Sequence, residues 1–377
     1  MLFLRLGRCE FFIFFVTLLL ALTMPETSAP DEAMRNDIPE WIYKNGVLPV
    51  GNEEELISNV WGFSYGFVPY LPSLLAIPFI AIFNLVYPDH FAVVLGTRLV
   101  SILSSIFSVW ISSKIAQKIF NEIGARLLFS VFIVLLPQYI FVGSYHNNDA
   151  FAVLSVLLFF LFLLKGMEDH WTFKTCMGLG VAISLCVLTY YNTLAFILSG
   201  FLYCLYCCIK DDSIQRKFLF ILGRVIYVLC VVCVLAGWFF IRNAILHDGD
   251  FLGISAQQMC AENRALSGQF VHFPVSPVAE GVSLGEMLFD FGWLETTLKS
   301  FVGVFGYMNI VMPNYYYLVY FVIYVLGLIL GVVYLLKSHR TKELFTISLC
   351  IILTVFLSIY RSYTWTGPKY HRTASIT

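Results

Sequence analysis

Charged residues are scarce in this 377-residue sequence: Asp, Glu, Lys and Arg make up 12% of it, whereas 59% is hydrophobic. A soluble domain carries roughly 25% charged residues, so this chain has too little polar surface to cover a water-soluble globule. Its formal net charge of −1 and its lack of a basic stripe give no footprint for nucleic acid. The composition therefore excludes a soluble globule and predicts an integral membrane protein with no nucleic-acid partner.

A disulfide or metal framework is missing as well, although the chain has ten cysteines. All but Cys260 lie within or at the edge of apolar runs, where cysteine behaves as a small hydrophobe. Cys204, Cys207 and Cys208 follow a helical spacing, but no histidine lies near them in the sequence. We therefore expect no metal site among the cysteines.

Apolar runs close to the ~20 residues that cross a bilayer recur along the chain. They predict an all-α polytopic membrane protein with about nine transmembrane helices. The first run follows Arg5 and Arg8, and we interpret it as a retained span and not as a cleaved signal peptide. The predicted spans are about 11–24, 92–112, 127–143, 150–165, 176–191, 193–209, 219–240, 317–336 and 344–360.

A further apolar run, 67–87, is interpreted as a helix on the outer membrane face that does not cross. Its Pro69, Pro72 and Pro78 suit a broken surface helix. If it does not cross, most of the 23 Lys and Arg residues fall in short loops on the side of the N-terminus, as the positive-inside rule requires. We therefore predict that the N-terminus lies inside and the C-terminus outside. The two long external segments are then about 25–91 and 241–316.

The first external segment opens with adjacent carboxylates, Asp31 and Glu32, close to the end of the first span. A partly desolvated carboxylate at the membrane surface could act as a general base. Alternatively, the two acids begin a helix over 31–45 and complement its dipole. The spacing by itself leaves both interpretations open.

Two further groups of polar residues adjoin the predicted spans. His146 and Asp149 lie in a polar segment, 143–149, that either reverses the chain as an ordinary turn or faces the same external cavity as Asp31. Arg98 lies inside the predicted span 92–112, where an ionisable residue is a functional candidate by default. It could bind a lipid phosphate or extend to the headgroups as an anchor. Arg242 has the same two interpretations, and Trp238 beside it favours the anchor.

Several short motifs resemble those of a known enzyme superfamily. Pro30-Asp31-Glu32 follows the first span, Asn45-Gly46-Val47-Leu48-Pro49 follows in the same loop, and Asn148-Asp149 ends the third span. Trp238, Arg242-Asn243 and Gly249-Asp250 follow the seventh. Over about residues 5–360 this layout resembles the GT-C superfamily of membrane glycosyltransferases. The likeness is greatest to the glycosyltransferase-39-like enzymes, which include protein O-mannosyltransferases and lipid A aminoarabinose transferases.

The resemblance implies an enzyme that moves a sugar from a polyprenyl phosphate in the membrane to an acceptor hydroxyl outside. Asp31 would be the general base, and the anomeric carbon would be inverted. Arg98, with His146 or Arg242, would stabilise the phosphate leaving group. The acceptor would be a glycan, a lipid or a protein, and the location a bacterial plasma membrane.

Glu32 and Asp149 would position the acceptor or the sugar, or hold a divalent cation where one is used. Arg35 occupies a position where many relatives have histidine, and we assign it to substrate positioning. The catalytic module would span residues 1–360. Relatives usually continue past the ninth span, so the short external tail 361–377 predicts a truncated end. The competing hypotheses are a polytopic transporter or lipid flippase, and a catalytically inactive truncated relative.

Overall fold

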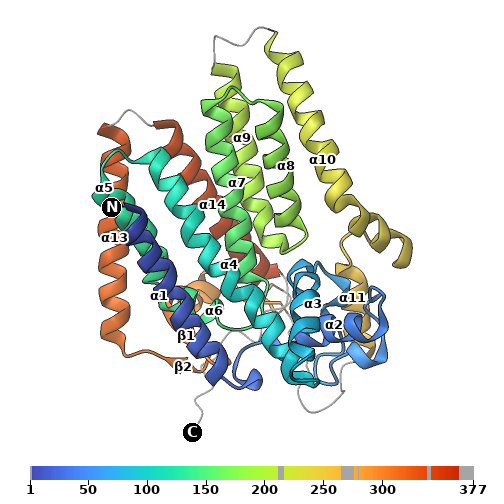
Figure 1. The fold of residues 1–377 in the computed structure, drawn as a ribbon. Helices are drawn as coiled ribbons and strands as arrows, with labels where there is room; N and C mark the ends of the chain where they lie inside the picture. Colours follow the sequence, from blue (N-terminus) through green and yellow to red (C-terminus); the bar gives the residue numbers. More distant parts are fainter. Residues whose placement is uncertain (1, 211–215, 265–275, 279, 338–340, 365–377) are drawn as a thin grey trace.

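The protein is an α-helical membrane protein in which long helices run side by side (Figure 1). The computed structural model describes residues 2–210, 216–264, 276–278, 280–337 and 341–364. Three shorter helices, α2 (Glu32–Asn45), α3 (Leu71–Asn84) and α11 (Ile254–Arg264), gather at one end of the long ones. This end is named the α2–α3 end below.

Among the described residues, five helical segments are long and apolar enough to cross a membrane. These segments are α4 (His90–Ile119), α7 (Asp149–Glu168), η4 with α9 (Tyr191–Thr193 and Leu194–Lys210), α10 (Lys217–Leu246) and α13 (Asn314–Lys337). Shorter apolar stretches lie in five other helices. They are α3 and α1 (Leu2–Thr23), α5 (Ile123–Val134), α8 (Phe173–Val187) and α14 (Thr341–Thr364).

The remaining elements are short and connect the long helices. They are η1 (Glu26–Ser28), η2 (Glu54–Leu56), η3 (Tyr65–Phe67), α6 (Pro137–Val142), the π-helix η5 (Glu286–Asp290), α12 (Trp293–Gly303), β1 (Val304–Phe305) and β2 (Ile310–Val311). The two strands pair antiparallel, with Val304 opposite Val311 and Phe305 opposite Ile310. The predicted external segment 241–316 therefore contains ordered structure, and α10 continues into it as far as Leu246.

Local sequence explains where several helices begin and end. The helix predicted over 31–45 is confirmed as α2, and it ends where Gly46 adopts a left-handed conformation (φ 69°) and donates its N–H to the Ile42 carbonyl. The run predicted as one span over 127–143 is divided instead into α5 and α6. Pro137 begins the second piece because it lacks an N–H and fits the first turn of a helix.

Helix α4 lies at the centre of the fold, where it packs against α1, α3, α5 and α7. Small side chains make this close approach possible, as is usual between membrane helices. Each serine on its buried face except Ser101 satisfies its own hydroxyl through a backbone carbonyl three or four residues earlier. The buried serines of α4 are Ser101, Ser104, Ser105, Ser108, Ser112 and Ser113.

An apolar core lies at the α2–α3 end, apart from the packing around α4. Ile38, Leu56 and Tyr70 pack there against Phe239 of α10. Gly253, just before α11, approaches this region so closely that a Cβ would lie 2.0 Å from the Phe67 carbonyl oxygen. Helix α14 reaches Thr364, and most of the predicted tail 361–377 lies outside the described residues.

Candidate functional site

Asp31 lies directly before α2 and does not cap it. Its backbone is left-handed (φ 60°, ψ −1°), and its side chain makes no hydrogen bond to the helix N-terminus. This conformation costs a non-glycine residue about 1–2 kcal/mol, so surrounding contacts must hold it. The carboxylate instead accepts a hydrogen bond from the Tyr65 hydroxyl, whose oxygen lies 2.6 Å from Oδ2. A helix start therefore explains the position of Asp31 but not the direction of its side chain.

Arg35 lies one helical turn after Asp31, and its guanidinium stacks over the Tyr65 ring, 3.9 Å from the ring centre. Burial opposes the charge of Arg35, but Tyr65, Asp31 and Asp149 outweigh it and raise the pKa of the guanidinium. Asp149, at the start of α7, stays accessible. Two carboxylates from distant parts of the chain therefore act on one permanently charged arginine.

A polar cavity of about 350 Å³ adjoins Asp31 and Arg35. It lies at the α2–α3 end and is bounded by α2, η3, the turn before α7, η4, α11 and the end of α14. Asn148 closes one side of it and is fixed by hydrogen bonds from its Nδ2 to the carbonyls of Pro69 (3.1 Å) and Thr189 (2.7 Å). The lining residues with polar side chains are Asp31, Arg35, Tyr65, Asn148, Thr189, Tyr190, Tyr191, Asn192, Gln257 and Arg361.

Arg361 is the functional candidate that the sequence did not single out. It comes from the last turn of α14, and its Nη1 donates to Asn192 Oδ1 across 3.1 Å. In the sequence it appears as one more cation after an apolar run, 330 residues from Asp31 by position, and only the packing of α14 on α9 brings it to the cavity. No local pattern distinguishes it from an ordinary interfacial anchor.

Glu32 and Arg98 form a buried ion pair behind the cavity. Arg98 donates from Nε to Oε1 of Glu32 (2.7 Å) and from Nη2 to Oε2 (2.8 Å). Its Nη1 donates to the carbonyls of Ala21 (2.6 Å) and Met24 (2.8 Å) at the end of α1. Both side chains are almost completely buried, and neither lines the cavity. This geometry gives Arg98 a structural role and does not favour the predicted contact with a phosphate.

His146 belongs to the same buried network. Its backbone N–H donates to Glu32 Oε1 (2.9 Å), and its ring contacts Asn36 Oδ1 through Nδ1 (2.8 Å) and Ser73 Oγ through Nε2 (3.3 Å). Burial, aided by the charge of Arg35, lowers the pKa of His146 to about 3. A neutral, fully buried imidazole is not suited to the predicted stabilisation of a phosphate. Its contacts instead tie the turn before Asp149 to α2.

Arg242 lies apart from the cavity. Its Nη2 donates to the carbonyl oxygens of Leu48 and Pro49, both at 2.9 Å, and so fixes the loop after α2 to α10. Its Nη1 is buried without a hydrogen-bond partner among the described residues. The anchoring interpretation of Arg242 therefore agrees better with its contacts than a role in binding substrate.

Asp31 is the one carboxylate among the described residues that line the cavity, and Asp149 acts on the site through the charge of Arg35. Within the described ranges, no group of three His, Cys, Asp or Glu side chains has an arrangement that could hold a metal ion. The charged residues that line the cavity in the described part of the chain are Asp31, Arg35 and Arg361.

Comparison with known proteins supports the membrane assignment. No curated protein matches this chain. A family model described as a predicted membrane protein (DUF2142) matches residues 51–370. The matched part contains Tyr65, Tyr190 and Arg361 of the cavity, and it begins after Asp31. Because the match covers most of the chain, the protein belongs to this family of predicted membrane proteins, DUF2142.

Proposed function

We propose that this protein is a membrane glycosyltransferase that moves a sugar from a polyprenyl-phosphate donor to an acceptor hydroxyl at the outer membrane face. The observation that carries the proposal is the carboxylate of Asp31 at a polar cavity that also contains two arginines. Its Oδ2 is oriented by Tyr65, and Oδ1 has no donor among the described residues. This arrangement leaves one carboxylate oxygen to accept a proton.

In the proposed reaction, Asp31 accepts the proton of the acceptor hydroxyl. The hydroxyl oxygen forms the new bond to the anomeric carbon from the face opposite the phosphate. The bond between that carbon and the phosphate oxygen breaks, and its electron pair leaves with the polyprenyl phosphate. The anomeric configuration is therefore inverted. The proton ends on Asp31 and the electron pair of the broken bond ends on the phosphate oxygen, so the step is balanced.

Arg361 is the proposed ligand of the donor phosphate. It reaches the cavity from the last turn of α14, and a guanidinium matches the geometry of phosphate oxygens. Arg35, whose charge interacts with those of Asp31 and Asp149, would hold the two carboxylates in position. Arg98 and His146 support the site from behind in this proposal and do not touch the substrate.

The proposed topology has nine spans with the N-terminus inside, as the distribution of Lys and Arg favours. The spans would be α1, α4, α5 with α6, α7, α8, η4 with α9, α10, α13 and α14. The α2–α3 end would then face outward, so that the lipid tail of the donor stays in the bilayer while its phosphate reaches the cavity. A bacterial plasma membrane is the proposed location.

The proposal is tested by measuring the polyprenyl phosphate released from a panel of polyprenyl-phosphate sugars, with acceptor extract supplied. Purified wild type is compared with Asp31→Asn and with Asp37→Asn, a matched change within the adjoining helix α2 and outside the cavity. Release that is lost in Asp31→Asn and kept in Asp37→Asn supports both the reaction and its base. Arg361→Gln is expected to lower kcat/KM for the donor by about tenfold or more.

Other results would change the assignment. Release that survives Asp31→Asn would retain the enzyme but exclude Asp31 as its base. Folded wild-type protein that releases nothing from any donor would favour a transporter, a lipid flippase or an inactive relative. Transport of the intact donor lipid across reconstituted vesicles would distinguish the flippase from the others.

A further inference from the structure

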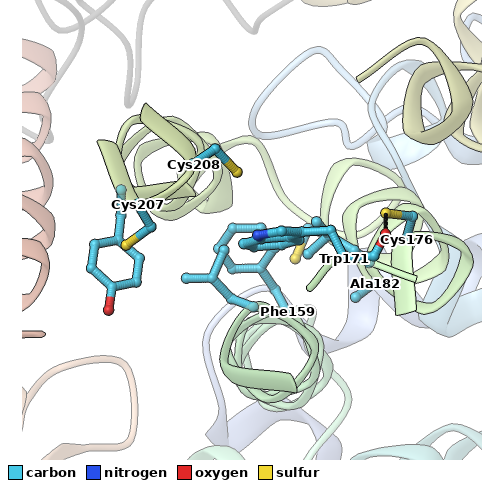
Figure 2. Close-up of a cluster of buried hydrophobic side chains, with 10 residues drawn as sticks. Phe159, Trp171, Cys176, Ala182, Cys207 and Cys208 are labelled. Carbon is cyan, nitrogen blue, oxygen red and sulfur yellow. Dashed lines mark hydrogen bonds between the residues drawn. The ribbon is translucent and has the colours of Figure 1, made fainter. Parts of the chain in front are cut away.

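An apolar groove of about 480 Å³ lies between α9 and α10. Residues of α7 and α8 also line the groove. The rings of Phe159 and Trp171 lie there between Cys176 of α8 and Cys208 of α9 (Figure 2). Arg224 of α10 is the one charged residue among the described side chains that line it. The groove is separate from the polar cavity beside Asp31, because the two share no lining residue.

The groove exists because α10 packs closely on α8 but barely on α9. At the α8 contact, a Cβ on Gly180 would lie 2.8 Å from Val231, so the two backbones approach each other there. Leu198 and Leu229, which face the groove from α9 and α10, remain 50% and 55% exposed. The groove therefore opens sideways, toward the lipid.

Arg224 is held at the wall of the groove by aromatic rings. Its guanidinium carbon lies 3.9 Å from the ring centre of Phe173 and 5.0 Å from that of Phe220. Its Nε is buried and donates no hydrogen bond in the part of the chain that the structure describes. An arginine that served only as an anchor would extend its head to water. This guanidinium is instead folded back onto the rings, beside apolar surface.

Arg224 lies close to the end of α10 that begins at Lys217. It lies seven residues into α10, or about 10 Å along the axis from Lys217. Further positive charge lies at the same end of the neighbouring helices: Lys174 lies in the first turn of α8, Lys210 ends α9 and Lys217 begins α10. A ligand with an anionic head and a long apolar tail would satisfy both the guanidinium and the groove.

We propose that the α9–α10 groove binds an anionic phospholipid from the leaflet at the Lys210–Lys217 end, with its phosphate on Arg224 and an acyl chain along the groove. The occupant is assigned from charge complementarity, since Arg224 gives an apolar groove one cationic end. Such a lipid fills the space that separates α10 from α9. The site does not depend on the proposed glycosyltransferase activity.

The test measures the lipid retained by the purified full-length protein by native mass spectrometry. Phosphatidylglycerol and phosphatidylcholine with identical acyl chains are added in equal amounts. Wild type is expected to retain phosphatidylglycerol about 5–10-fold better, which is the effect of one well-placed cation. Arg224→Leu should lose this preference, whereas Arg224→Lys and the matched control Lys174→Leu should keep most of it. Leu198→Trp, which narrows the groove, should reduce retention of both lipids.

Three results would overturn the assignment. Equal retention of the two lipids by wild type would exclude a headgroup site, and so would an undiminished preference in Arg224→Leu. Displacement of phosphatidylglycerol by an equal amount of polyprenyl phosphate would identify the groove as a site for the polyprenyl lipid. If Arg224→Leu does not elute as a folded monodisperse protein, the comparison of Leu198→Trp with wild type and the competition experiment still decide the matter.

Discussion

Removing one partner of the Glu32–Arg98 ion pair should destabilise the protein strongly, because both charges are buried and each compensates the other. Replacing Arg98 by Met removes two charge-assisted hydrogen bonds to Glu32 and two to the end of α1. Removing one partner of such a pair costs about 3–5 kcal/mol, since the other charge is left buried. With an unfolding entropy of about 2.1 cal/mol/K per residue, this corresponds to a fall in Tm of about 4–6 °C.

The measurement is thermal unfolding of the purified protein in detergent, followed by near-UV circular dichroism. Arg98→Met is compared with Arg126→Met, which removes a half-buried arginine whose Nε donates to the Phe120 carbonyl at 2.8 Å. The control should lower Tm by about 1 °C or less. The double variant Glu32→Gln/Arg98→Met should recover part of the loss, because no lone charge remains and the introduced amide still offers an oxygen to the N–H of His146.

An unchanged Tm for Arg98→Met would refute this reasoning. If the same variant also bound the donor more weakly, Arg98 would be a phosphate ligand, as the resemblance to glycosyltransferases implies. A double variant that is no more stable than Arg98→Met would show that the uncompensated charge of Glu32 is not the cause of the loss. The design therefore separates the structural role of Arg98 from a role in binding.

Two further predictions concern the α2–α3 end. Burial, with the charge of Glu40, raises the pKa of Asp37 from its usual 3.8 to about 6. The folded state then binds more protons between those values, so this contribution to stability is lost as pH rises through 6. Asp37→Asn should therefore raise Tm by about 1–3 °C at pH 8 and change it little at pH 4, and equal effects at both pH values would exclude this origin. Gly253→Ala should lower Tm by about 3 °C or more, because φ is +70° and a Cβ would lie 2.0 Å from the Phe67 carbonyl oxygen. Gly249→Ala, with φ +93° but no atom within 4 Å, isolates the backbone strain and should cost about 1 kcal/mol, so an equal loss in both variants would contradict the steric argument.

Composition and local pattern determined the class of the protein. Long apolar runs with few charges can be stable only in contact with lipid, so the membrane assignment needed no knowledge of packing. Helix α2 was also predictable, since Glu32 favours its first turn and Gly46 permits the left-handed conformation that ends it. The division of the run 127–143 at Pro137 has a local cause too, although its apolar character hid the break.

Packing alone decided which polar residues share a site. A buried arginine such as Arg98 must find a compensating group, but its sequence cannot say whether that group is a carboxylate or a phosphate. The answer came from Glu32, 66 positions away, which α4 and α2 bring within 2.7 Å. Arg361 and Asp31 line one cavity for a similar reason. Helix α14 packs on α9, which places its last turn at the α2–α3 end. Apolar runs specify which segments enter the membrane, whereas the partners of its few charges depend on side-chain packing between helices distant in the sequence.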